Sequence, residues 1–206
     1  MPLAFFDLDG TLAPGPLSSE QSFFLRLLSR RRLGPRQLLA GLAFLPRGRS
    51  NKAYLAGLAP EEVEAWAESF IEARPLTALR ASALERLESH RRAGDRLALL
   101  TGAPDFLAAP LARRLGFAHC IATVCAREEG RYSAAPPVER PYGAAKARLA
   151  AALCRSLGEE LRDAAAYADS HSDLALLERV GRPVAVSPDA RLARAARERG
   201  WELLER

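Results

Sequence analysis

The sequence predicts an α/β fold: a doubly wound, Rossmann-like parallel sheet with a small helical cap inserted after its first strand. Beyond residue 76, short apolar segments alternate with longer segments of helical periodicity, which is typical of a parallel sheet covered by helices on both faces. Residues 14–75, by contrast, show helical segments and no strand pattern. We therefore expect a core domain of residues 1–13 and 76–206 and a helical cap of residues 14–75.

The first strand is the apolar run Leu3-Ala4-Phe5-Phe6, and Asp7-Leu8-Asp9-Gly10-Thr11 follows it directly. Side chains at positions i and i+2 of a strand point the same way, so Asp7 and Asp9 project toward one point. Two neighbouring carboxylates raise each other's pKa unless a cation or hydrogen-bond donors offset their charge. An Asp-Gly turn after a strand is common in globular proteins, but a divalent metal site explains the acidic pair better.

Proline and glycine divide the cap segment. Pro14-Gly15-Pro16 interrupts strand and helix alike. Ser18-Ser19-Glu20 is typical of a helix start, because apolar residues follow at helical spacing. Gly34-Pro35 ends this helix, and further helices are expected at about 36–45, 51–58 and 60–73. The last of these has a proline and two acids in its first turn, which favours a helix N-terminus.

Helices and strands are expected to alternate through the rest of the chain. The strands are predicted at 96–100, 118–124, 164–168 and 183–186. The helices are predicted at 76–92, 106–115, 144–157, 173–180 and 190–199. Doubly wound sheets bind ligands at the carboxyl ends of their strands, so polar groups are expected at the ends of other strands as well.

Two further strands do end in polar groups. Thr101 and Gly102 follow one of them, and a hydroxyl beside backbone amides suits an oxyanion, although helix capping also accounts for a threonine there. Asp169 follows another strand, and Asp173 comes four residues later. Asp173 alone would merely favour the helix dipole. A second acidic pair at a second strand end therefore indicates a binding site at this edge of the sheet.

Lys146 lies in the first turn of the predicted helix 144–157, where a positive charge opposes the helix dipole. An ordinary surface lysine is the alternative, but the acidic strand ends favour a lysine that reaches their carboxylates and a bound phosphate. His171 flanks the second acidic pair, and a solvated turn histidine is the simpler interpretation of it. His90 and His119 lie outside all of these motifs.

Composition limits the classes of function. The 206 residues are 49% hydrophobic and 27% charged, as in globular proteins, and no apolar stretch is long enough to cross a bilayer. No basic region precedes the first apolar run, and the three cysteines lack metal-ligand spacing, so we expect a cytoplasmic protein with reduced thiols. The net charge of +5 comes with dispersed arginines, which favours a solvated basic surface that attracts anionic substrates over a nucleic-acid site.

The order Asp-Leu-Asp-Gly-Thr, Thr-Gly, Gly-x-x-Lys and Asp-x-x-x-Asp resembles the haloacid dehalogenase superfamily of phosphohydrolases. The helical segment after the first motif is similar to the small cap of that superfamily in position and helicity. Residues 167–174 and 183–186 resemble its phosphoserine-phosphatase-like branch. The resemblance extends over nearly the whole chain, and the ordered set of motifs is far more specific than any one of them.

The resemblance implies an Mg²⁺-dependent phosphomonoesterase that hydrolyses a small phosphorylated metabolite through an aspartyl-phosphate. Asp7 is then the nucleophile, and Asp9 is the general acid toward the leaving alcohol and afterwards the base that activates water. The implied metal-site residues are Asp7, Asp9 through its backbone carbonyl, Asp169 and Asp173. The implied phosphate-binding residues are Thr101, Gly102, Lys146 and Ser172. The cap residues expected near the alcohol are Glu20, Arg47 and Arg49.

Three departures from phosphoserine phosphatases question phosphoserine as the substrate. Those enzymes have an acidic residue shortly after the first motif to hold the substrate ammonium, whereas here Pro14-Gly15-Pro16-Leu17 occupies that stretch and the first acid is Glu20. Thr101 stands where that family often has serine, and Ser172 where it often has asparagine. Phosphotransfer to an alcohol acceptor, a non-catalytic Mg²⁺- or phosphate-binding partner protein, and a nucleic-acid end-phosphatase remain as alternatives.

Overall fold

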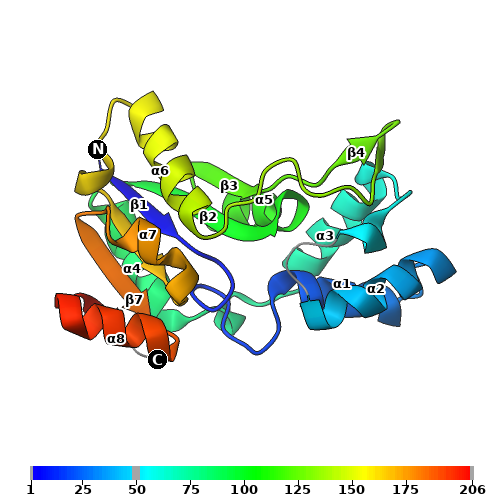
Figure 1. The fold of residues 1–206 in the computed structure, drawn as a ribbon, viewed down its shortest axis with the longest axis horizontal. Coiled ribbons are helices and arrows are strands. Elements are labelled where there is room, and N and C mark those ends of the chain that lie inside the picture. The colour runs from blue at the N-terminus through cyan, green and yellow to red at the C-terminus, as the bar shows by residue number, and fades with distance from the viewer. Residues whose placement is uncertain (1, 48–51, 205–206) are drawn as a thin grey trace.

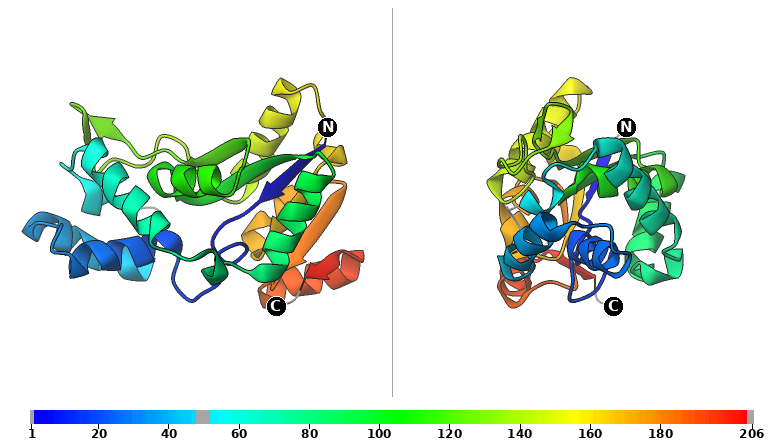
Figure 2. Two further views of the ribbon diagram at one scale, coloured as in Figure 1. Left: turned by 180° about the vertical axis from the view of Figure 1, so that it is seen from behind. Right: turned by 90° about the vertical axis from the view of Figure 1, so that its right-hand side faces the viewer.

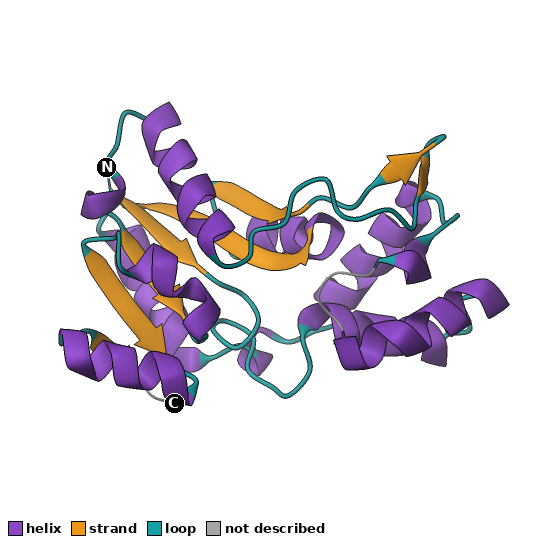
Figure 3. Cartoon of the chain, in the orientation of Figure 1, coloured by secondary structure: helices purple, strands orange, loops and turns teal. Residues whose placement is uncertain are grey.

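The computed structural model describes residues 2–47 and 52–204, without the side chains of residues 42–47. Its centre is a six-stranded sheet in which every pairing between neighbours is parallel (Figures 1 and 3). From one edge to the other, the strands are β3 (His119–Thr123), β2 (Arg96–Pro104), β1 (Leu3–Phe6), β6 (Ala165–Ala168), β7 (Arg182–Val186) and β8 (Glu202–Leu204). The predicted fold class is confirmed, and β1 lies at the centre of the sheet.

Both faces of the sheet are buried, which explains why its strands are continuous apolar runs. Leu3 and Phe5 of β1 belong to one apolar cluster, whereas Ala4 and Phe6 belong to another. The first cluster is completed by helices α6 (Ala144–Ser156), α7 (Leu174–Leu177) and α8 (Ala190–Arg199). The second is completed by helices α4 (Ala81–Arg92) and α5 (Asp105–Arg114) on the opposite face (Figure 2).

The helices that the structure describes between residues 18 and 72, here called the helical insert, lie to one side of the sheet (Figures 1 and 2). They are α1 (Ser19–Ser29), α2 (Pro35–Arg47), a 3₁₀ turn (Ala53–Leu55) and α3 (Pro60–Glu72). Ser18 begins α1 with a capping box, because its hydroxyl accepts from the Gln21 amide and the Gln21 side chain accepts from the Ser18 amide. The ring of Phe23 lies 5.7 Å from that of Phe106, which joins the insert to the core through α5.

A hairpin of β4 (Arg127–Glu128) and β5 (Arg131–Tyr132) reaches from the core to the insert. The backbone of Tyr132 exchanges hydrogen bonds with the insert, because its carbonyl accepts from the Gly57 amide and its amide donates to Leu58 O. The short, charged strands of this hairpin lack the apolar alternation that predicts a strand from sequence. The contacts of the insert with the core therefore include a segment that is distant in sequence.

Two predicted elements differ from the observed ones because the chain pairs with a neighbour. The helix expected over 76–92 is a 3₁₀ turn (Leu76–Ala78) followed by α4. Between them Arg80 is extended, and its amide donates to Leu12 O in the loop after β1. The strand expected to end at residue 100 continues through an irregular stretch to Pro104, which pairs with Thr123 of β3.

Two other elements are shorter or additional. The helix expected at about 51–58 is, in its described part, the single 3₁₀ turn Ala53–Leu55. Strand β8 was not predicted, because its three residues follow α8 closely and are too few to show a periodicity. Among the described residues, none of the helices combines the length and apolar character that a membrane span requires.

Candidate active site

Three neighbouring strands bring their polar residues to one edge of the sheet. Asp7 follows β1, Asp169 follows the adjacent β6, and Thr101 belongs to β2 on the other side of β1. The Asp7 amide still donates to Tyr167 O at 3.0 Å, so pairing with β6 holds this residue in place. All three line a cavity of about 330 Å³. This cavity is of the size that takes a small metabolite.

Lys146 links the carboxylates on the floor of this cavity. Its Nζ lies 2.8 Å from Asp7 Oδ1 and 3.0 Å from both carboxylate oxygens of Asp173, and its side chain is almost completely buried. Burial disfavours the ammonium, but Asp7 and Asp173 outweigh that effect and raise the pKa of Lys146. The lysine is therefore a fixed positive charge beside Asp7. The unfavourable position in the first turn of α6 is compensated by these two ion pairs.

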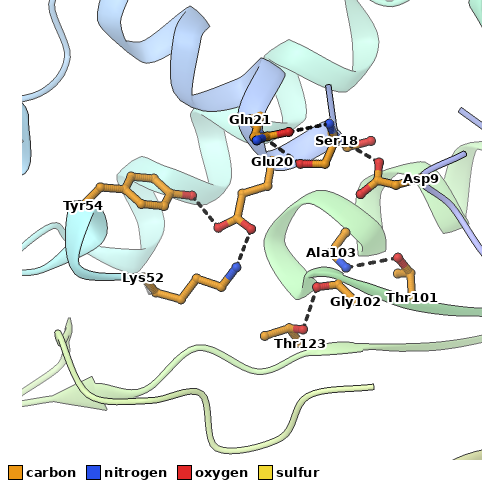
Figure 4. A network of polar contacts seen from close by, with 11 residues as sticks. Asp9, Ser18, Glu20, Gln21, Lys52, Tyr54, Thr101, Gly102, Ala103 and Thr123 are labelled. Carbon is orange, nitrogen blue, oxygen red and sulfur yellow. Dashed lines mark hydrogen bonds and ion pairs between the residues drawn. The ribbon is translucent and has the colours of Figure 1, made fainter. Parts of the chain in front are cut away.

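Asp9 lies in the same cavity, but its carboxylate is held by the insert. The amide of Ser19, the first residue of α1, donates to Asp9 Oδ1 at 2.7 Å (Figure 4). Burial raises the pKa of Asp9, and this bond to Ser19 partly opposes the rise. A buried carboxyl with a raised pKa is suited to hold and transfer a proton.

Gly10 and Thr11 fit closely around Asp169. Gly10 has φ +89°, and a Cβ there would lie 2.0 Å from a carboxylate oxygen of Asp169, so only glycine permits this approach. The Thr11 hydroxyl donates to Asp169 Oδ1 at 3.2 Å. The guanidinium of Arg80 donates to the carbonyls of Gly10 and Thr11, at 2.8 and 3.0 Å, and fixes the loop from the other side.

The predicted phosphate-binding residues also line this cavity. Thr101 Oγ1 accepts from the Ala103 amide at 3.0 Å, which leaves its own proton for a ligand oxygen. Gly102 lies in the irregular stretch of β2, and its carbonyl accepts from the Thr123 hydroxyl at 2.8 Å. The Ser172 hydroxyl donates to Ser170 Oγ at 3.1 Å on the other side of the acidic cluster. The structure thus brings together the predicted core-domain residues, while their roles remain predictions.

The acidic cluster fits Mg²⁺ by its donor type and its charge. Burial, followed by the charges of Asp7 and Asp173, raises the pKa of Asp169 to about 7, and the hydrogen bond from Thr11 partly opposes the rise. In the described part of the chain, no three acidic, histidine or cysteine side chains are grouped as a metal cage. Mg²⁺ needs no such cage, since it takes one or two carboxylates and completes its shell with waters and substrate phosphate. Asp7 and Asp169 supply such a pair.

Glu20 of α1 lines the cavity, but its carboxylate is bound by two other residues of the insert. Lys52 Nζ forms an ion pair with Glu20 Oε2, and the Tyr54 hydroxyl donates to Glu20 Oε1 at 2.9 Å (Figure 4). Burial raises the pKa of Glu20, and Lys52 opposes this. The predictions of Arg47 and Arg49 as contacts of the alcohol are not tested, since the side chain of Arg47 and all of Arg49 lie outside the described residues.

Sequence reasoning missed Lys52, Arg140 and Tyr142. Arg140 and Tyr142 belong to the loop before α6 and line the cavity, and the Arg140 guanidinium lies 4.8 Å from the centre of the Tyr142 ring. No motif marks this loop. Lys52 had a detectable signal, because the sequence contains two lysines, Lys52 and Lys146, among 30 lysines and arginines. Lysine and arginine differ in shape and in hydrogen-bond geometry, so the two lysines of such a chain are worth inspecting.

The sequence matches the haloacid dehalogenase-like hydrolase family over residues 4–178. Over 97% of its length the chain is 33% identical to the phosphoserine phosphatase SerB1 of Mycobacterium tuberculosis, of which it covers 69%. A structure of a protein of unknown function from Bordetella pertussis superposes with a TM-score of 0.74 and 28% identity, over 98% of this chain and 97% of that one. Phosphoserine phosphatase in its apo form shares the fold with a TM-score of 0.65 and 17% identity, over 99% and 92% of the two chains.

The chain therefore belongs to the haloacid dehalogenase-like hydrolase family. Within the superfamily it is a member of the phosphoserine-phosphatase-like branch, as the sequence motifs predicted. The prediction of an enzyme that hydrolyses phosphoric monoesters is confirmed at this level.

Proposed function

We propose that this protein is an Mg²⁺-dependent phosphomonoesterase that hydrolyses a small phosphorylated metabolite through an aspartyl-phosphate on Asp7. The observation that carries the proposal is the placement of Asp7, with Lys146 Nζ 2.8 Å from its carboxylate, on the floor of a small cavity. The division into a core of residues 1–13 and 76–206 and a cap of residues 14–75 is part of the same proposal. The contribution of Ser18 and Glu20 to the lining of the cavity supports it.

In the first step, an oxygen of Asp7 attacks phosphorus, and the bond from phosphorus to the alcohol oxygen breaks. Asp9 gives its proton to that oxygen, for which its raised pKa is suited. In the second step, Asp9 takes a proton from water while the water oxygen attacks phosphorus, which returns the Asp7 carboxylate. Lys146, Thr101 and the Gly102 amide hold the charge of the phosphate oxygens through both steps.

Asp7 and Asp169 would hold Mg²⁺, together with the Asp9 backbone carbonyl. When bound, the metal supplies positive charge against the phosphate oxygens and the acidic cluster. Asp173 also pairs with Lys146, at 3.0 Å, and helps to keep it in place. The phosphate is thus positioned between fixed charges, which is most of what phosphoryl transfer requires of a protein.

The test is phosphate release from a panel of phosphomonoesters, with and without Mg²⁺, for the wild type and for Asp7→Asn. Loss of a covalent nucleophile lowers turnover by more than ~10⁴-fold. Asp163→Asn is the matched control, because Asp163 is exposed and is not among the residues that line the cavity. Undiminished, Mg²⁺-dependent release by a folded Asp7→Asn variant would refute the nucleophile. Product analysis with excess alcohol separates hydrolysis from phosphotransfer.

A further inference from the structure

Besides the predicted phosphate-binding residues, the cavity is lined by residues of the insert and of the loop before α6. The insert contributes Ser18 and Glu20, and the loop contributes Arg140, Pro141 and Tyr142. This loop passes close to the phosphate-binding stretch of β2, since a Cβ on Gly102 would lie 3.5 Å from Pro141 O. An alcohol attached to a phosphate beside Thr101 would thus contact these side chains.

The carboxylate of Glu20 is compensated before any substrate arrives. Lys52 is 2% exposed, and its ammonium pairs with one carboxylate oxygen while the Tyr54 hydroxyl donates to the other (Figure 4). Of the insert residues that the structure describes around the cavity, Ser18 and Glu20, only Glu20 is acidic. A substrate ammonium near Glu20 would therefore meet a carboxylate whose charge the Lys52 ammonium already balances.

The use of lysine in this chain makes the pair distinctive. Only Lys52 and Lys146 are lysines among the 30 lysines and arginines, and both are buried against carboxylates that line one cavity. An ammonium is a compact charge that fits a closed site, whereas a guanidinium is planar and larger. Lys52 is therefore a positioning residue that acts on the cavity through Glu20.

Arg140 adds a positive charge to the same part of the cavity. Its guanidinium lies over the ring of Tyr142, and the backbone turns tightly there, since the Tyr142 amide donates to Arg140 O at 2.9 Å. A guanidinium stacked on an aromatic ring is pre-organised, and its edge can donate two parallel hydrogen bonds to a carboxylate. Arg140 thus adds a positively charged side chain to the lining of the cavity that Glu20 shares.

We infer that the enzyme selects a phosphorylated alcohol that carries a carboxylate and no ammonium group, that is, a phosphorylated hydroxy acid. Arg140 binds the carboxylate of the alcohol. Glu20, whose charge Lys52 already offsets, adds no net attraction for an ammonium group. The inference rests on the proposed function, because it concerns the leaving alcohol of that reaction. It separates this chain from a phosphoserine phosphatase by charge alone, since phosphoserine carries the ammonium.

Three esters that differ by single groups test the inference. 3-Phosphoglycerate has a hydroxyl where O-phosphoserine has its ammonium, and glycerol 3-phosphate has a hydroxymethyl group where 3-phosphoglycerate has its carboxylate. We expect kcat/KM for 3-phosphoglycerate to exceed both others by about tenfold or more, because a mispaired charge in a desolvated site is penalised at least that strongly. p-Nitrophenyl phosphate serves as an unspecific ester that reports the chemistry alone.

Two substitutions assign the preference to residues. Arg140→Gln should bring the ratio of 3-phosphoglycerate to glycerol 3-phosphate close to one, whereas Arg194→Gln, at an exposed arginine of α8, should leave it unchanged. Lys52→Met leaves Glu20 uncompensated and should move the preference toward O-phosphoserine by about tenfold. Should Lys52→Met fail to fold, the double variant Glu20→Gln/Lys52→Met is tested in its place, and it should keep the wild-type preference.

The outcomes separate this inference from the proposed function. A preference for 3-phosphoglycerate that depends on Arg140 supports it. Asp7-dependent phosphate release with O-phosphoserine equal or preferred overturns it and leaves the phosphatase in place. A ratio unaffected by Arg140→Gln, or lost in the double variant, also overturns it. Absence of Asp7-dependent release from all four esters refutes the proposed function, and the inference falls with it.

Discussion

The two lysines of the chain are both buried at one cavity, but the charges around them are balanced differently. Lys146 faces Asp7 and Asp173, and Asp169 adds a further carboxylate to the cluster. Lys52 pairs with Glu20, whose other oxygen accepts from a tyrosine. The core centre thus holds more negative charge than its lysine offsets, whereas the insert centre is neutral.

This difference indicates what each centre does. A cluster with more carboxylates than positive charges lowers the stability of the fold. Such a cluster is retained where a bound cation and phosphate balance its charge. A neutral buried pair needs no ligand, and it determines which charges the cavity accepts. The first centre is therefore suited to chemistry and the second to selection of the alcohol.

The largest expected difference concerns turnover. Lys146→Met removes the cation beside the reacting atoms, so we expect release from p-nitrophenyl phosphate to fall on the order of 10²–10³-fold, as for other groups that stabilise charge in a transition state. Lys52→Met changes the same residue type at a distance from those atoms, and its effect on this ester should be below about tenfold. Circular dichroism of both variants provides the control for folding. Equal losses in two folded variants would contradict the division of roles.

Stability provides a second comparison, between the single and double variants of the Glu20–Lys52 pair. Lys52→Met leaves a buried, unpaired carboxylate at Glu20, and breaking a buried ion pair in this way costs about 3–5 kcal/mol in the free energy of unfolding. The double variant Glu20→Gln/Lys52→Met should recover most of that loss, because neutral side chains of similar shape replace the whole pair. Urea unfolding measures both. A loss of less than about 1 kcal/mol in Lys52→Met would mean that water screens the pair.

The two centres also differ in how far the sequence predicts them. Asp7, Thr101 and Asp169 follow or belong to neighbouring strands, so strand periodicity and parallel topology are sufficient to place them at one edge. The contact between Glu20 and Lys52 depends on how a 3₁₀ turn packs against α1, which no periodicity encodes. Local patterns thus predict what a strand end presents, and long-range packing determines the rest.

The same distinction explains the elements that were missed. Strands β4 and β5 are charged and two residues long, and their pairing is stabilised by backbone bonds to Gly57 and Leu58 of the insert. Arg80 interrupts a stretch of helical pattern because its backbone and side chain bond to the loop after β1. In both cases a tertiary contact overrides the local preference for helix or loop.

The smallest expected effect is the response of stability to metal. Mg²⁺ that binds the folded chain alone should raise its stability by about 2.7 kcal/mol at a hundredfold excess over Kd, or several degrees in Tm for a domain of this size. Asp169→Asn should abolish that rise. In metal-free buffer, however, Asp169→Asn should be more stable than the wild type, because it removes one of the mutually repelling carboxylates.

Glu20→Gln is the matched comparison at the neutral centre. It should keep the Mg²⁺-dependent rise in Tm and be less stable than the wild type without metal, because it leaves the buried ammonium of Lys52 without its counter-charge. Differential scanning fluorimetry with Mg²⁺ and with a chelator measures all four conditions. If Asp169→Asn and Glu20→Gln changed Tm in the same direction without metal, the two centres would not differ in charge balance. A rise in Tm for Asp169→Asn and a fall for Glu20→Gln would show that Asp169 lacks a balancing cation in the metal-free protein, whereas Glu20 has one in Lys52.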